Sequence, residues 1–247
     1  TAANKDMGRG DVVPPLTYTL SGFVNGDSAS VVGGSAALST TATSSSAAAR
    51  YPIAAGAGSL AATNYEFQFT SGTLTVHPKV LDVRVRWGSK SMSLIGLNRV
   101  LPFVNITAVD VVFSDDVTVG NGNLALTSTT AAARTYGFTE FRFNPNTDTA
   151  SWTLPTALGI DRLMLALDTR FGAQADPTIS VWNTIGPVRF GVLPGDIDGN
   201  GQVNNQDVGL YKKPPASLLL WLDVDGDGDV DKADEDAVRR RTGTRLP

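Results

Sequence analysis

Residues 81–87 read Leu81-Asp82-Val83-Arg84-Val85-Arg86-Trp87. Apolar residues alternate with charged ones along this stretch, and a period of two places each kind on its own face of a β-strand. The alternation recurs further along the chain, at Val109, Val111 and Phe113, at Phe141 and Phe143, and at Leu163, Leu165 and Leu167. Turn-forming residues lie between these stretches, at Gly120-Asn121-Gly122 and Asn144-Pro145-Asn146. Short alternating strands joined by turns predict a β-sandwich over residues 80–194.

The residues before this sandwich, 1–79, are rich in Ala, Ser, Thr and Gly. Together with abundant Val and few Glu or Lys, this composition favours strands joined by tight turns over helices. The region ends in the strand-like Thr73-Leu74-Thr75-Val76, followed by His77-Pro78-Lys79. Because proline cannot donate to a sheet ladder, we place a boundary here and expect a separate β domain over residues 1–79.

This first region carries six short motifs in order. They are Leu16-Thr17-Tyr18-Thr19, Ser21-Gly22-Phe23-Val24-Asn25-Gly26-Asp27, Leu38-Ser39-Thr40-Thr41-Ala42, Tyr51-Pro52-Ile53, Asn64-Tyr65-Glu66-Phe67 and Gly72-Thr73-Leu74-Thr75-Val76. The series resembles the MBG family (mostly bacterial β-grasp) over residues 7–77. The resemblance implies a β-grasp-like fold and a place in large secreted adhesin-like proteins.

The start of the chain departs from that family. Members usually have Tyr-Gly where this chain has Met7-Gly8, and a strand before it, for which this chain offers only residues 1–6. If that strand is missing, the sheet has an unpaired edge, to which a strand from another surface protein or from a copy of this chain could add. The alternative is a fragment cut at this point.

The tail, residues 195–247, contains two twelve-residue loops with acidic or amide residues at fixed positions. The candidate ligands are Asp196, Asp198, Asn200, Gln202, Asn204 and Asp207 in the first loop, and Asp223, Asp225, Asp227, Asp229, Asp231 and Asp234 in the second. The spacing matches the EF-hand type, with a glycine at the sixth position for the sharp turn and a backbone carbonyl donated by the seventh. Oxygen ligands on flexible loops favour calcium over magnesium, so we expect two Ca²⁺ sites.

The second loop needs a cation more than the first. Five of its carboxylates (Asp223, Asp225, Asp227, Asp231 and Asp234) are expected to converge, and their repulsion would oppose folding without a divalent ion. The first loop brings three carboxylates and two amides and is expected to bind more weakly. Val203 and Val230, at the eighth positions, are expected to pair across the loops as a short hydrophobic bridge, and helix-compatible stretches follow at 206–213 and 233–241. The alternative is a solvated, acidic Asp/Gly turn region.

The duplicated loops resemble the type I dockerin, whose typical opening is matched by Gly195-Asp196-Ile197-Asp198-Gly199-Asn200-Gly201. The resemblance implies a small α-helical, calcium-binding module and a cohesin-like receptor. Many dockerins of cellulosomes carry Ser-Thr before the last ligand, where this chain has Asn205-Gln206 and Lys232-Ala233, and the spacer with Pro214-Pro215 is unusual. These departures place an ordinary cohesin partner in doubt. Metal binding should supply much of the stability of so small a module.

A looser resemblance covers the middle region and carries no functional residue. Several short motifs there are similar to those of the β-sandwich that precedes terminal dockerins in large bacterial surface proteins. They are Trp87-Gly88-Ser89, Leu97-Asn98, Leu101-Pro102-Phe103, Phe113-Ser114-Asp115-Asp116 and residues 161–167. The expected fold class is therefore mainly β: a β-grasp-like domain and a β-sandwich, followed by a dockerin-like module.

Charge and composition exclude several classes of protein. The whole net charge of −4 lies in residues 195–247, which hold 11 acidic and 7 basic residues, and the remainder is neutral with 13 of each. Without a basic track for phosphates, nucleic-acid binding is not expected. No cysteine is present, so disulfides and thiolate metal sites are excluded. No apolar run is long enough for a membrane span.

Catalytic residues are scarce, and we do not expect an enzyme. A Ser-His-Asp triad would have to use the single histidine, His77, which we interpret as a linker residue. A glycosidase pair would have to use Glu66 and Glu140, which we interpret as outward-facing strand residues. Asp115-Asp116 is interpreted as a turn. Trp87, Trp152 and Trp182 could form a sugar platform, but core packing is the favoured interpretation.

These observations predict a non-enzymatic structural or adhesive component of an extracellular or bacterial cell-surface assembly. The alternative is a dockerin-type anchoring module, in which the β domains are spacers that attach an upstream enzyme or protein to a cohesin-like receptor. Polysaccharide binding by the sandwich is a third class, and it requires an exposed aromatic face.

Overall fold

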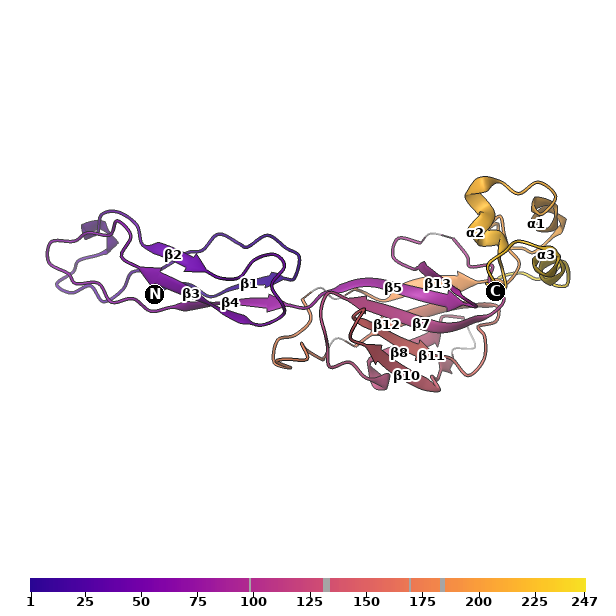
Figure 1. The fold of residues 1–247 in the computed structure, drawn as a ribbon, viewed down its shortest axis with the longest axis horizontal. Helices are drawn as coiled ribbons and strands as arrows, with labels where there is room; N and C mark the ends of the chain where they lie inside the picture. Colours follow the sequence, from indigo (N-terminus) through magenta and orange to yellow (C-terminus); the bar gives the residue numbers. More distant parts are fainter. Residues whose placement is uncertain (98, 131–133, 169, 183–184) are drawn as a thin grey trace. The chain divides into compact units, whose positions relative to one another are not determined.

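The computed structural model describes residues 1–97, 99–130, 134–168, 170–182 and 185–247 (Figure 1). Within these residues the protein is mainly β, with three sheets and short helices near the C-terminus, which confirms the predicted fold class. The chain divides into two compact units. Unit 1 comprises Thr1–Lys79, Ser114–Thr118 and Phe171–Asn183; unit 2 comprises Val80–Phe113, Val119–Arg170 and Thr184–Pro247. The division into three domains remains a prediction.

Unit 1 is built on one four-stranded sheet in the order β1-β4-β3-β2. The strands are β1 (Lys5–Gly8), β2 (Ala37–Thr40), β3 (Arg50–Gly56) and β4 (Gly72–His77), and a 3₁₀ turn spans Ala29–Val31. β1 is parallel to β4, and the other two pairs are antiparallel. Met7, Ile53, Leu74 and Val76 form the centre of its core.

The edge of β4 is covered by the chain's own residues. Lys5 to Gly8 pair in register with Leu74 to His77, so a strand is present at this position. The unpaired edge, expected if that strand were missing, is therefore not found beside β4. Only Lys5 and Asp6 of this strand precede Met7, since Met7 and Gly8 are themselves paired with Val76 and His77.

Two segments from the middle of the sequence complete unit 1. Asp115 lies in a bend, as predicted, and its carboxylate pairs with Arg9 at 3.0 Å. Asp176 forms an ion pair with Arg50 of β3. Sequence patterns assign both segments to the sandwich, because contacts between residues this far apart leave no local signal.

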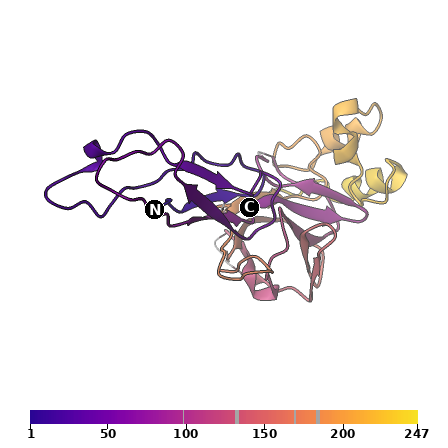
Figure 2. The same cartoon turned by 60° about the vertical axis from the view of Figure 1, so that its left-hand side comes forward.

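Unit 2 contains a five-stranded sheet in the order β10-β11-β7-β5-β6 and a four-stranded sheet in the order β13-β12-β8-β9, seen from a second direction in Figure 2. The first sheet consists of β5 (Val80–Trp87), β6 (Lys90–Ser93), β7 (Ile106–Phe113), β10 (Glu140–Asn144) and β11 (Thr149–Thr153). The second consists of β8 (Leu124–Ser128), β9 (Thr135–Tyr136), β12 (Asp161–Leu167) and β13 (Val188–Val192). A 3₁₀ turn at Asn121–Asn123 precedes β8.

The alternation predicted from the sequence holds along most of these strands. Val109, Val111 and Phe113 are buried along β7, and Leu163 and Leu165 along β12. The turn predicted at 144–146 joins β10 to β11. Of the motif Leu97-Asn98, Asn98 lies outside the described residues.

Leu81 is an exception, since its side chain is exposed while Val83, Val85 and Trp87 are buried. The pairing of β5 with β7 shifts register between Val80 and Asp82, and an extra residue at such a bulge is turned away from the face that its neighbours share. The predicted placement of Leu81 on the core face is therefore wrong.

The C-terminal residues form short helices around a hydrophobic cluster in unit 2 that also includes Leu193 and contacts Val100 and Val104 of the sandwich. They are α1 (Asn205–Leu210), a 3₁₀ turn (Ala216–Leu218), α2 (Leu219–Leu222) and α3 (Lys232–Arg239). The helices predicted at 206–213 and 233–241 are present but end earlier, at Leu210 and Arg239. Ile197, Val203, Leu222, Val224 and Val238 are buried together between them.

Candidate metal centre

The two acidic loops repeat with an offset of 27 residues, from Asp196 to Asp223 and from Asp207 to Asp234. In both loops the first and twelfth positions are buried: Asp196, Asp207 and Asp234 are 0% exposed and Asp223 is 3% exposed. Carboxylates are seldom buried unless they are paired, hydrogen-bonded or bound to a cation. The burial is thus a property of the repeat, shared by both copies.

In the first loop, Asp196 holds the turn together through backbone donors. Gly199 and Asn200 donate their N–H groups to its Oδ1 at 3.0 and 3.1 Å, and Gly201 donates to its Oδ2 at 2.9 Å. Asp207 accepts from Ile197 at 2.8 Å across the loop. These bonds fix where the two carboxylates lie.

The second loop repeats these bonds. Gly226 donates its N–H to Oδ1 of Asp223 at 2.8 Å, as Gly199 does to Asp196. Val224 donates to Asp234 at 2.8 Å, as Ile197 does to Asp207. In each loop the twelfth-position carboxylate also accepts from the backbone at the ninth position and starts the following helix with a capping box.

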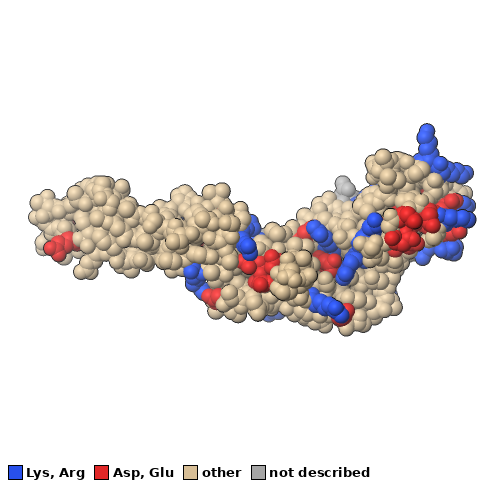
Figure 3. Space-filling model, viewed as in Figure 1, with Lys and Arg blue, Asp and Glu red and all other residues tan. Residues whose placement is uncertain are grey.

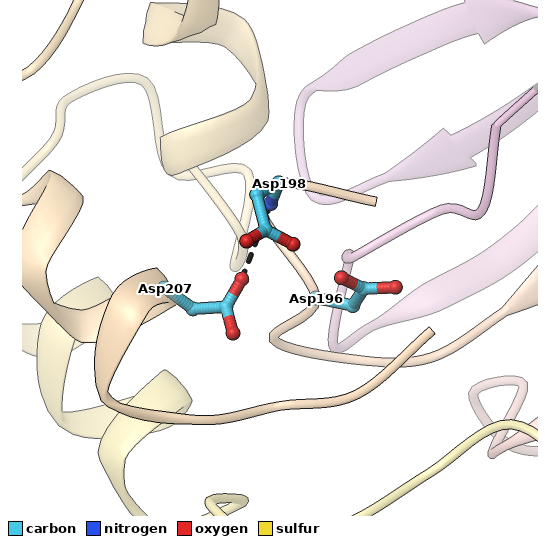
Figure 4. A group of neighbouring side chains, drawn as sticks. All are labelled: Asp196, Asp198 and Asp207. Carbon is cyan, nitrogen blue, oxygen red and sulfur yellow. Dashed lines mark hydrogen bonds between the residues drawn. The ribbon is translucent and has the colours of Figure 1, made fainter. Parts of the chain in front are cut away.

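The carboxylates gather in three groups, in each of which one oxygen per residue lies within 4.8 Å of the others. They are Asp196, Asp198 and Asp207; Asp223, Asp225 and Asp227; and Asp229, Asp231 and Asp234. Figure 4 shows the first group, with the backbone N–H of Asp198 bonded to Asp207 at 3.1 Å. The second loop thus contributes two such groups, which together contain all six of its aspartates.

The amide positions of the first loop have structural partners. Asn204 caps α1 by accepting from the N–H of Gln206 at 2.6 Å. The Asn200 side chain donates to Asp198 at 2.8 Å and accepts from the N–H of Gln202 at 2.9 Å. Gln202 and Asn200 are exposed. Among the six candidate ligands of this loop, only Asp196 and Asp207 are buried.

Burial and mutual repulsion disfavour the charged form of several of these carboxylates. Burial, followed by the charges of Asp207 and Asp198, raises the pKa of Asp196 to about 6. Burial also raises the pKa of Asp225 and of Asp234, and the charge of Asp227 raises the pKa of Asp229. A bound cation would reverse both effects, since it favours the ionised form.

The donor set fits Ca²⁺. Every candidate ligand is an oxygen, both loops carry several carboxylates, and Gly201 and Gly228 have the positive φ of 87° and 120° that the sixth-position turn requires. On the face drawn in Figure 3, acidic atoms are concentrated at this module with Lys and Arg beside them. A hard divalent cation is the ligand class that this set would take.

The second loop is attached to the sandwich through four consecutive backbone carbonyls. Trp87 Nε1 donates to the carbonyl of Asp223 at 2.9 Å, and the N–H of Val104 donates to that of Val224 at 2.9 Å. The Asn105 amide donates to the carbonyl of Asp225. Ser89 donates to that of Gly226 through both its N–H and its hydroxyl, at 2.8 and 2.9 Å. The segment carrying the first four loop positions is therefore held by the sandwich.

Aromatic packing extends this attachment. Phe103 stacks on Trp87 with ring centroids 3.6 Å apart and on Trp221 of α2 at 5.7 Å. The Arg99 guanidinium lies 3.8 Å from the Trp221 ring and donates to the carbonyl of Ile197 in the first loop. The sandwich thus contacts both loops, a contact that no local pattern in the sequence indicates.

A basic side chain of the sandwich also lies beside the second loop. Lys90 Nζ of β6 is 3.7 Å from Asp223 Oδ2. The ammonium offsets part of the negative charge of the second loop and competes with a cation for the same oxygen.

The side chains of Val203 and Val230 pack in one hydrophobic cluster, in line with the predicted hydrophobic bridge. The backbone partners of Val203 come from the chain after α3: its N–H bonds to the carbonyl of Thr244, and its carbonyl accepts from Gly243.

The structure also shows the burial and contacts of the histidine, tryptophan and glutamate residues that were considered from the sequence. His77 is 9% exposed, bonded through Nδ1 to the carbonyl of Ser180 at 2.8 Å and through Nε2 to Asp6 at 3.0 Å, so its interpretation as a plain linker residue is wrong. Trp87 and Trp152 are fully buried as predicted, whereas Trp182 is 47% exposed and rests on His77. Glu66 and Glu140 are exposed, and only Glu140 lies in a strand.

Among the described residues, no helix combines the length and the apolar character that crossing a bilayer requires.

Comparison with known proteins gives a family match over the N-terminal region and a distant likeness to solved structures. No curated protein matches the chain. A solved structure of zebrafish RET cadherin-like domains 1 to 4 is 14% identical, with a TM-score of 0.20, and the match covers 59% of this chain but only 33% of that chain. The family model described as "MBG domain (YGX type)" matches residues 1–75. The resemblance of the N-terminal region to the MBG family is thereby confirmed.

Proposed function

We propose that this protein is a non-enzymatic structural or adhesive component of a bacterial extracellular or cell-surface assembly. In this proposal its C-terminal module is a dockerin-like domain that binds two calcium ions. The observation that carries the proposal is the duplicated loop, in which buried first and twelfth aspartates recur in the same hydrogen-bonded positions.

Calcium would act as a structural ion in this module. Uncompensated buried carboxylates are costly, and a divalent cation bound by several of them converts that cost into stability of the folded state. The attachment of residues 223–226 to the sandwich supports a further role, because ordering of the second loop would also order its contacts with Trp87, Ser89 and Asn105.

The match of residues 1–75 to the MBG family supports the extracellular assignment. Calcium is plentiful outside cells, so a module whose calcium sites have dissociation constants of about 10⁻⁴–10⁻³ M can fill them there. The dense Thr, Ser, Gly and Ala content of unit 1, with few titratable groups, suits a spacer or adhesive domain more than a catalytic one.

A second candidate function is anchoring to a cohesin-like receptor. Asn205 and Gln206 at the start of α1, and Lys232 and Ala233 at the start of α3, are all exposed. Their side chains are therefore accessible to a receptor even though the loops beside them contact the sandwich.

Thermal unfolding with calcium, magnesium or chelator tests the first proposal. Calcium should raise the melting temperature of the module relative to chelator, and magnesium should raise it less. Asp227→Asn should reduce the calcium effect. Asp236→Asn is the matched control, because it removes a half-buried carboxylate of α3 that lies outside the twelve-residue loop and pairs with Lys232. Identical melting curves in calcium and in chelator would contradict the proposal.

A pull-down separates assembly from anchoring. Recovery of a scaffold with cohesin-like domains, lost on simultaneous Gln206→Ala and Lys232→Ala substitution, supports anchoring. Recovery of further copies of this chain supports assembly.

A further inference from the structure

The five-stranded sheet of unit 2 has a polar groove on its outer face. The groove has a volume of about 330 Å³, and its lining comes from three strands, β5, β10 and β11. These strands lie in one sheet with β7, as Figure 1 shows. The alternate residues of the same strands, such as Val85 and Trp152, are buried in the core. The groove therefore opens on the side of the sheet that faces away from the core.

The groove arises because short side chains lie between long ones. Thr149, Ser151 and Thr153 of β11 are half-buried and form its floor. The register pairs each of them with a longer, exposed residue of β10: Glu140 with Thr153, Arg142 with Ser151 and Asn144 with Thr149. Arg86 of β5 forms the opposite wall, and the residue of β7 between Arg86 and Thr153 is the small Ala108.

Several polar atoms of the groove are free to bind a ligand. Within the described part of the chain, neither the Ser151 hydroxyl nor the Thr153 hydroxyl has a hydrogen-bond partner. Glu140 accepts from Arg142 through Oε1, and its Oε2 has no partner among the described residues. The Asn144 side chain accepts a backbone hydrogen bond at 3.0 Å through Oδ1, which leaves its NH₂ group as a donor. The groove thus offers both donors and acceptors.

The charges on this face of the sheet are balanced, because each guanidinium has a carboxylate partner. The three pairs are Arg142 with Glu140 at 2.6 Å, Arg84 with Asp82 at 2.6 Å and Arg86 with Asp110 at 3.4 Å. A phosphate, sulfate or carboxylate ligand would have to compete with these carboxylates for the same guanidinium groups. The face therefore suits an uncharged ligand better than an anion.

A sugar chain matches these properties better than a peptide does. Each sugar hydroxyl donates one hydrogen bond and accepts others, so it can use both kinds of free group in the groove. A peptide partner would require apolar anchor pockets. Among the described residues that line the groove, none is aromatic or aliphatic.

We propose that this groove binds a neutral glycan chain. The planar groups of Glu140, Arg142 and Asn144 would each bridge two neighbouring hydroxyls from one wall, and the floor hydroxyls of Ser151 and Thr153 would bond to hydroxyls that point into the sheet. The wall residues of β10 are two apart, so these contacts repeat along the strand over roughly 13 Å. The glycan would therefore lie parallel to β10 and β11.

Hydrogen bonds alone would hold the glycan. The aromatic sugar platform considered from the sequence is not available here, because Trp87 and Trp152 are buried. A single site should therefore bind weakly, and adhesion would come from many copies of the protein on one surface. This inference rests on the proposed adhesive role and names its class of ligand, but it concerns the sandwich alone and does not involve the calcium loops.

Nuclear magnetic resonance titration of the isotope-labelled full chain, in calcium, tests the proposal. The probes are the neutral oligosaccharides cellohexaose, mannohexaose and xylohexaose, with hexagalacturonate as the acidic comparison. At least one neutral probe at millimolar concentration should shift the backbone amide signals of residues 140–144 and of residues 149–153 together. Hexagalacturonate should shift them less.

Substitutions connect these shifts to the groove. Thr153→Val removes a floor hydroxyl with little change of shape and should weaken binding several-fold. Arg142→Gln changes a side chain that is 77% exposed and should weaken binding about tenfold or more. Arg170→Gln is the matched control, because Arg170 is also exposed and also pairs with the carboxylate two residues before it, Asp168, but lies outside the groove. It should leave binding unchanged.

The groove and the calcium module can fail separately. Shifts confined to other residues, shifts with hexagalacturonate alone, or no shift with any neutral probe would overturn the groove assignment and leave the calcium proposal untouched. Equal weakening by Arg142→Gln and Arg170→Gln would also overturn it. A melting temperature that does not respond to calcium, together with retained glycan binding, would contradict the proposed calcium-binding module and leave this inference standing.

Discussion

At the scale of single residues, the contact between Gly226 and the sandwich is the tightest approach around the candidate centre. A Cβ at Gly226 would lie 2.3 Å from the backbone oxygen of Trp87, and the residue has a φ of 78°. Gly199 holds the same position in the first loop with a φ of 76°, but the atoms nearest to a Cβ there would belong to the Arg99 side chain, at 3.4 Å.

We expect Gly226→Ala to destabilise unit 2 by about 1–3 kcal/mol more than Gly199→Ala does. Both substitutions strain a left-handed backbone, so the difference isolates the clash with the sandwich. Urea unfolding in saturating calcium measures it. Equal losses for the two variants would show that the second loop is not held against β5.

Lys90 supplies a second prediction at this scale. Lys90→Gln removes the ammonium 3.7 Å from Asp223 and should raise calcium affinity by about threefold or more, an effect that weakens with added salt. Calcium titration by calorimetry measures the change. Lys212→Gln, at an exposed position of the same module, should leave the affinity within error; an equal gain there would indicate a general charge effect.

At the scale of secondary-structure elements, Asp161 at the start of β12 joins β12 to β8 and β9. It is 4% exposed and accepts from Ser128 at 2.7 Å and from Tyr136 at 2.6 Å. Burial alone would raise the pKa of Asp161, but these hydrogen bonds and the backbone N–H of Arg162 outweigh it and lower the pKa.

The pKa of Asp161 is lower in the folded state than in the unfolded state. Its carboxylate therefore stabilises the fold at pH values above the unfolded-state pKa, and this stabilisation is lost as the pH falls through the folded-state pKa. Asp161→Asn should therefore cost about 1–3 kcal/mol at neutral pH. The difference in unfolding free energy between wild type and variant should narrow below about pH 4. Thermal unfolding from pH 7 to pH 3 measures it, and a gap that is constant with pH would contradict the assignment.

The elements also show how far the sequence could predict the structure. The alternation of apolar and polar residues predicted the strands β5, β7 and β12. The spacing of Asp and Gly predicted two loops followed by short helices. Both signals are local in the sequence. The bulge at Leu81 depends on how β5 pairs with β7, and the partner of Val203 depends on where residues 243–244 lie. Such pairings between distant residues leave no periodic trace.

For the candidate site, the sequence identified the acidic positions but not their surroundings. Nothing near Asp223 in the chain indicates that Trp87, Ser89, Asn105 and Lys90 would meet its loop. His77 is a similar case, because both of its partners, Asp6 and Ser180, are far away in the sequence.

At the scale of the whole molecule, unit 2 joins the sandwich and the C-terminal module into one compact body. Buried Trp87 donates to the carbonyl of Asp223, so its fluorescence should respond to the second loop. We expect chelation to shift Trp87 emission and to lower the unfolding temperature of the sandwich as well as that of the module. Asn105→Ala should reduce the effect of chelation on the unfolding temperature of the sandwich. An unfolding temperature of the sandwich that does not change on chelation would show that the sandwich and the C-terminal module fold independently.

The most direct measurement is calcium titration of the intact 247-residue chain by isothermal calorimetry after removal of divalent ions. The predicted result is two calcium ions per chain, with the tighter site lost in Asp223→Ala and the weaker one in Asp196→Ala. Absence of binding heat at millimolar calcium, together with an unchanged melting temperature, would contradict the account.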